Sequence, residues 1–150
     1  TPLFAILNSE FRRRVIEEAA AHQLDLIFTF VWQLEDPADA GEVERLVASY
    51  ADAPDGEIAI VELYADLGTR LARNRGEDRI AAKPTKRDLA WSDANVRDLE
   101  RYVLNTDPTS SSLTPADAFL TRYPHLRLET SAHTPAETAE RVLSWLDEQR

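Results

Sequence analysis

The chain has 150 residues, of which 43% are hydrophobic, so it is long enough and apolar enough to bury the core of one domain. Its 27 acidic residues outnumber its 17 basic residues, and the formal charge of −10 argues against a general nucleic-acid binder or a protein held on an anionic membrane. The absence of cysteine excludes disulfides, zinc–thiolate sites and thiol nucleophiles.

The start of the chain and its glycine content suggest that the sequence is not the whole protein. No apolar run approaches the length of a membrane span, and nothing at the start is typical of a signal peptide, so we expect a soluble, cytoplasmic protein. The chain begins at Thr1 and contains no methionine, from which we expect that an N-terminal segment is missing. No two of its four glycines are close enough to form a phosphate-binding loop.

The first half of the chain alternates helical and strand patterns. Helices are expected over residues 2–22, from apolar residues at helical spacing, and from Asp36-Pro37 to about residue 50. Residues 24–32 (LDLIFTFVW) and 58–64 (IAIVELY) are nearly continuous apolar runs, typical of strands buried on both faces of a parallel sheet. Asp66 can cap a third helix that stops at Gly76. The apolar face of the first helix consists of Phe4, Leu7, Phe11 and Val15, widened by Ile16 and Ala19.

The second half continues the alternation. Ser92 can cap a helix, residues 105–113 form a loop, and Thr114-Pro115 opens a short helix. Residues 125–130 alternate as an edge strand does, and Thr134-Pro135 opens the last helix. Strands separated by helices indicate a single α/β domain over residues 1–150, with a parallel sheet between helical layers (α/β/α). Three strands are few for so much helix, so we expect that neighbouring strands are absent.

Basic residues are concentrated in residues 70–87, which hold seven cations and two acids in an otherwise acidic chain. Such a segment attracts small polyanions, and the planar fork of arginine matches phosphate oxygens. The alternative to a phosphate-binding segment is a solvated helix face followed by a loop. In the chain, a predicted strand and helix lead into the basic connection, and another helix follows it. The lid of small nucleotide-dependent kinases has the same order of elements.

The chain resembles the P-loop kinase superfamily, in particular its shikimate-kinase-like and adenylate-kinase-like members. The resemblance covers nearly the whole chain, with a lid-like segment at about residues 75–92, and it implies ATP and magnesium as cofactors. Its motifs are weak one by one and moderately specific in combination. They are Phe11-Arg12, the LIFTFVW run, Glu62-Leu63, Ala65-Asp66-Leu67, Arg70, Arg73-Asn74, Arg79, the KPTKRD stretch from Lys83 to Asp88, Trp91-Ser92, and HLRLETS leading into Thr134-Pro135.

The resemblance implies a role for ten residues. The nucleotide would contact Arg70 or Arg73 and the loop from Ser131 to Thr134, which corresponds to the loop beside the adenine ring. The lid cations Arg79, Lys83 and Lys86 would close over the transferred phosphoryl group. The small-molecule acceptor would contact Arg12, Thr29 and Trp32. Phosphoryl transfer depends mainly on positioning and charge neutralisation, which converging cations supply.

The chain departs from the family in two places. The loop G-x-x-x-x-G-K-[ST] is absent, and we expect that it precedes Thr1; a degenerate member without the loop is the less favoured alternative. No acidic residue directly follows LIFTFVW, since Glu35 and Asp36 come later, so no magnesium-orienting acid and no metal ligand can be assigned.

Other functions stay open at this point. Trp32 and Trp91 are more often packing residues than substrate platforms, and the three histidines lack the spacing of a metal site. An incomplete parallel sheet also fits a non-catalytic interaction module that forms a homodimer. A nucleotide hydrolase or an antibiotic-modifying phosphotransferase would use the same fold.

Overall fold

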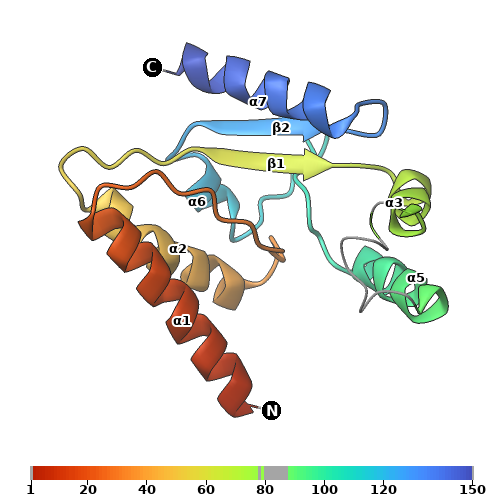
Figure 1. Ribbon diagram of the computed structural model, residues 1–150, viewed down its shortest axis with the longest axis horizontal. Coiled ribbons are helices and arrows are strands. Elements are labelled where there is room, and N and C mark those ends of the chain that lie inside the picture. The colour runs from red at the N-terminus through yellow and green to blue at the C-terminus, as the bar shows by residue number, and fades with distance from the viewer. Residues whose placement is uncertain (1, 78, 80–87, 150) are drawn as a thin grey trace. The chain divides into compact units, whose positions relative to one another are not determined.

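The computed structural model describes residues 2–77, 79 and 88–149. They form a mixed α/β structure that is mostly helical and contains a parallel sheet of two strands (Figure 1). In chain order the elements are α1 (Pro2–Ala21), α2 (Pro37–Ala51), β1 (Ile60–Tyr64), α3 (Leu67–Asn74), α5 (Leu89–Asp98), the 3-10 helix η2 (Leu99–Arg101), α6 (Asp117–Leu120), β2 (His125–Glu129) and α7 (Pro135–Glu148).

The chain folds into two compact units. The first contains Thr1–Ile60 and Ser110–Pro124, and the second contains Val61–Thr109 and His125–Arg150. Each unit therefore consists of two separate stretches of sequence. A single domain over residues 1–150 stays a prediction.

The core of the first unit is a cluster of apolar side chains from the segment after residue 30, from α2 and from α6. Phe119 is 1% exposed, and its ring meets that of Trp32 edge-on at 5.5 Å between centroids. The amide of Ala116 donates to the carbonyl of Leu34 at 3.2 Å, which ties the two stretches of this unit together. The buried members of the cluster are Trp32, Leu34, Val43, Ala116, Phe119 and Leu120.

The strand predicted over residues 24–32 does not form, and that prediction was wrong. The segment belongs to no helix or strand, and Ile27 and Val31 are 94% and 67% exposed. A strand becomes stable only when a neighbouring strand accepts its backbone hydrogen bonds, whatever the preference of its residues. The apolar face of α1 is likewise only partly covered, because Ile16 is buried while Phe4 and Phe11 are about 70% exposed.

The second unit carries the sheet. In Figure 1 the arrows of β1 and β2 lie side by side and point the same way, and α7 packs along β2. Strands were predicted at both places, and both are present. Helix α7 starts at Thr134-Pro135 as predicted, and Thr134 caps it in a reciprocal box with Glu137. Helix α3 packs against α5.

The start of α5 differs from the prediction. Asp88, not Ser92, caps this helix, accepting the amide of Trp91 at 3.0 Å. Ser92 is buried one turn later and donates its hydroxyl to Asn74 at 2.9 Å. Either side chain could cap a helix, and the contact with Asn74 decides between them. Within the described residues, no helix has the length and apolarity needed to cross a membrane.

Candidate functional site

The carboxyl ends of β1 and β2 meet in the second unit, and the loops that follow them are bonded to each other. The amide and the hydroxyl of Thr130 both donate to the carbonyl of Tyr64, at 2.8 and 2.9 Å. The amide of Asp66 donates to the hydroxyl of Ser131 at 3.1 Å. In open α/β sheets, ligands bind at this edge, beyond the carboxyl ends of the strands.

Arg73 joins helix α3 to the loop after β2. Its Nη1 donates to the hydroxyl of Thr130 at 3.0 Å, and its Nη2 donates to the carbonyls of Thr130 and of His133, the latter at 3.2 Å. The structure thus brings together two segments, nearly 60 residues apart in sequence, that the family resemblance assigns to nucleotide contact. Thr134 follows this loop directly as the cap of α7.

The other arginines at the start of the basic segment are bonded to protein acceptors. Arg70 donates its Nε to the carbonyl of Ala65 at 3.0 Å and its Nη2 to the carboxylate of Glu100. Arg75 donates its Nε to Asp93 at 2.7 Å. Their charges are therefore partly neutralised within the second unit, which reduces their capacity to hold a phosphate.

Of the three predicted lid cations, only Arg79 is described; Lys83 and Lys86 lie outside the described residues. Arg79 is half-buried. Its Nε is buried and has no hydrogen-bond partner in the part of the chain that the structure describes. A buried donor without an acceptor costs free energy, and an anionic ligand that accepted from it would recover that cost.

The sheet edge also carries negative charge. Hydrogen bonds from Thr69, its hydroxyl foremost, and then from Ser131, lower the pKa of Asp66 to about 2. The hydroxyl and the amide of Ser131 similarly lower the pKa of Glu129. Both carboxylates are therefore ionised at neutral pH, and a phosphate at this edge would need cations beside it.

The three predicted acceptor contacts all belong to the first unit. Arg12 lies exposed on α1, and Thr29 lies exposed in residues 24–32. Trp32 is 8% exposed within the hydrophobic core. This position favours a packing role for Trp32. Contact of all three with a substrate stays a prediction.

Glu62 on β1 belongs to one of the motifs quoted above, but its hydrogen-bond network was not identified from the sequence. The side chain of Glu62 is 11% exposed. It accepts from the amide and the hydroxyl of Thr106 at 2.8 and 2.7 Å, and it lies 3.1 Å from Nε2 of His125 and 3.4 Å from Nε of Arg127. The available signal was a charged residue inside the apolar run IAIVELY. Glu62 fixes the segment after η2 onto the sheet.

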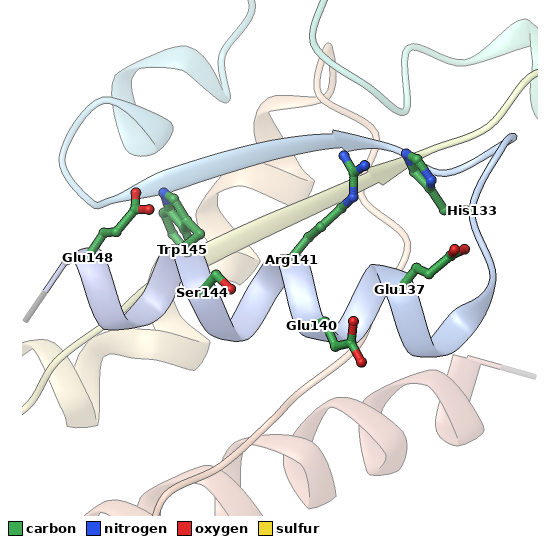
Figure 2. Close-up of a pocket in the computed structure, with 7 residues that line it drawn as sticks. All are labelled: His133, Glu137, Glu140, Arg141, Ser144, Trp145 and Glu148. Carbon is green, nitrogen blue, oxygen red and sulfur yellow. The ribbon is translucent and has the colours of Figure 1, made fainter.

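Among the described residues, the second unit has hollows beside α3 and along α7. One, of about 280 Å³, lies beside the start of α3 and is lined in part by Tyr64, Asp66 and Arg70. The other, of about 480 Å³, follows one side of α7 (Figure 2). Acidic residues predominate along it, which favours neither phosphate nor nucleotide. Its lining residues are His133, Glu137, Glu140, Arg141, Ser144, Trp145 and Glu148.

Among the described residues, no group of three or more His, Asp or Glu side chains could hold a metal ion. Magnesium that arrives with a nucleotide is held mainly by phosphate oxygens and water, with one or two carboxylates, so such a group is not required for it. No protein family, no curated protein and no solved structure matches the chain.

Proposed function

We propose that the chain is part of an ATP-dependent phosphotransferase with a P-loop-kinase-like α/β/α fold that acts in the cytoplasm on a small-molecule acceptor. The observation that carries the proposal is the contact of Arg73 with Thr130 and His133. It joins two segments assigned to the nucleotide at the sheet edge where α/β proteins bind their ligands.

Each part of the site has a distinct task in this proposal. The loop from Ser131 to Thr134, together with the start of α3, receives the nucleoside. Arg79, aided by Lys83 and Lys86, neutralises charge on the phosphoryl group as it passes to the acceptor. The resemblance also implies acceptor contacts for Arg12, Thr29 and Trp32. Bound magnesium would supply further charge neutralisation between the phosphates.

The proposal needs a phosphate-binding loop that these 150 residues do not contain. We therefore expect that the chain alone binds ATP weakly and transfers no phosphate. An extended chain that carries such a loop before Thr1 should bind ATP more tightly, because backbone amides and a lysine then surround the phosphates.

Calorimetric titration of ATP into this chain and into the extended chain tests the proposal. Arg79→Ala in the extended chain should weaken ATP binding by about tenfold, as expected for the loss of one charge-assisted hydrogen bond. The matched control is Arg97→Ala, an exposed cation on α5. If neither chain binds ATP at millimolar concentration, the proposal fails.

A second function, a homodimeric interaction module, is favoured by the exposed apolar face of α1. Phe4, Leu7 and Phe11 are 69%, 59% and 70% exposed and recur at helical spacing. The same face on a second copy would cover it, as in two-fold symmetric dimers. Light scattering should then report a dimer that Phe11→Glu converts to a monomer. A monomeric wild-type chain would refute this function.

A further inference from the structure

The guanidinium of Arg73 donates hydrogen bonds to acceptors within the protein. Both of its Nη atoms donate to the loop after β2, and two of the three acceptors are backbone carbonyls, those of Thr130 and His133. A planar guanidinium holds several acceptors in one fixed arrangement, which a lysine ammonium cannot reproduce. Arg73 therefore constrains the backbone of the loop, and phosphate oxygens would have to compete with these acceptors.

The loop that Arg73 holds is fixed from other directions as well. Thr130 is 6% exposed and bonded to the carbonyl of Tyr64, and the hydroxyl of Ser131 accepts from the amide of Asp66. The amide of Ser131 donates to Glu129 at 2.7 Å, and the amide of His133 donates to the carbonyl of Thr130 at 3.1 Å. A loop held in this way is ordered before a ligand arrives, which lowers the entropy cost of binding.

We infer that Arg73 is a positioning residue that holds residues 130–133 in the conformation that receives the nucleoside, and that it is not a phosphate ligand. The inference rests on the proposed function, and it changes the role that the family resemblance gives to Arg73. The two roles predict opposite results. A phosphate ligand affects the binding of polyphosphate, whereas a residue that positions the loop affects the binding of nucleoside.

The test uses Arg73→Lys, which keeps the charge and loses the planar fork. Adenosine and inorganic triphosphate are titrated separately into the ¹⁵N-labelled chain, and the shifts of the loop amides are followed by NMR. We expect adenosine binding to weaken by about tenfold and triphosphate binding to stay within about twofold of wild type, since the lost contacts are those to the loop. Arg97→Lys should leave both affinities unchanged.

Variants at Thr130 test whether weaker adenosine binding comes from a displaced loop or from a misfolded chain. Thr130→Val removes the hydroxyl that accepts from Arg73 and should weaken adenosine binding in the same direction, while Thr130→Ser should restore it. Urea unfolding of each variant should stay cooperative, which separates a displaced loop from an unfolded chain. Weaker triphosphate binding with unchanged adenosine binding in Arg73→Lys would overturn the inference.

Hydrogen exchange without any ligand distinguishes this inference from the proposed function. Arg73→Lys should speed exchange at the amides of Asp66 and His133 by about tenfold, because both bond to the loop. If the wild-type chain binds no adenosine, the nucleoside role fails, while the titration of ATP into both chains decides the proposed function. Faster exchange in Arg73→Lys would still show that Arg73 holds the loop in place. Unchanged exchange would refute this role of Arg73, whatever the result with nucleotide.

Discussion

Removing the mostly covered carboxylate of Glu62 should destabilise the second unit more than removing a fully exposed charge does. Its side chain is 11% exposed and accepts from both the amide and the hydroxyl of Thr106, with His125 also within 3.1 Å. Hydrogen bonds to a charged group contribute about 1.5–3 kcal/mol each, and their losses at one site overlap. We expect Glu62→Ala to cost about 3 kcal/mol, because the remaining donors are left in a nearly buried site.

Urea unfolding followed by circular dichroism measures this loss as a lower midpoint with an unchanged slope. Glu62→Gln keeps one acceptor oxygen and should cost about half as much. The control is Asp98→Ala, whose carboxylate is 56% exposed and pairs with an exposed Arg101, so its loss should cost less than about 0.5 kcal/mol. A cost below about 0.5 kcal/mol for Glu62→Ala would show that water replaces these contacts and that the reasoning is wrong.

Three further predictions concern local features. Thr134→Ala should cost about 1 kcal/mol in urea unfolding because it removes the cap of α7, and Thr134→Ser should restore stability; equal stability of all three chains would contradict this. The depressed pKa of Asp66, about 2, means that its ionised form stabilises the fold above about pH 4 and that this contribution is lost as the pH falls toward 2. The difference in urea midpoint between wild type and Asp66→Asn should therefore shrink over that range, and a constant difference would refute it. Phe119→Ala, at 1% exposure, should cost about 3–5 kcal/mol and change the fluorescence of the adjoining Trp32, whereas an unchanged midpoint would contradict its place in the core.

The starts of α2 and α3 were predictable from the sequence because their signals are local, whereas a turn precedes α6, which begins at Asp117 and not at the predicted Thr114-Pro115. Asp36 caps α2 and Asp66 caps α3, as their positions before the helical patterns indicate. The failure at α5 has a tertiary cause. Asp88 and Ser92 are both suitable caps, and the hydrogen bond of Ser92 to Asn74 reaches a different helix, which no local pattern contains.

Strands were predictable only where the chain supplies a partner. Residues 60–64 and 125–129 pair with each other, whereas the equally apolar residues 24–32 form no ladder. Hydrophobic pattern indicates that a segment suits a sheet, and the hydrogen bonds that make it a strand come from another segment. The hydrogen-bond network of Glu62 escaped prediction for the same reason, because its partners Thr106 and His125 are far away in sequence.

The number of cations in the basic segment overstates its capacity to bind phosphate. Residues 70–87 contain seven cations, yet Arg70, Arg73 and Arg75 are each bonded to protein acceptors: Arg70 to Glu100 and a carbonyl, Arg73 to the loop after β2, and Arg75 to Asp93. In a chain with a large excess of carboxylates, an arginine near the surface readily finds one, and only a cation without such a partner retains its full attraction for a phosphate. Arg79 meets that condition at its Nε among the described residues. Phosphate binding by this segment therefore depends on which of its cations lack an acceptor within the protein. The arginines of α3 instead stabilise the sheet edge through their hydrogen bonds.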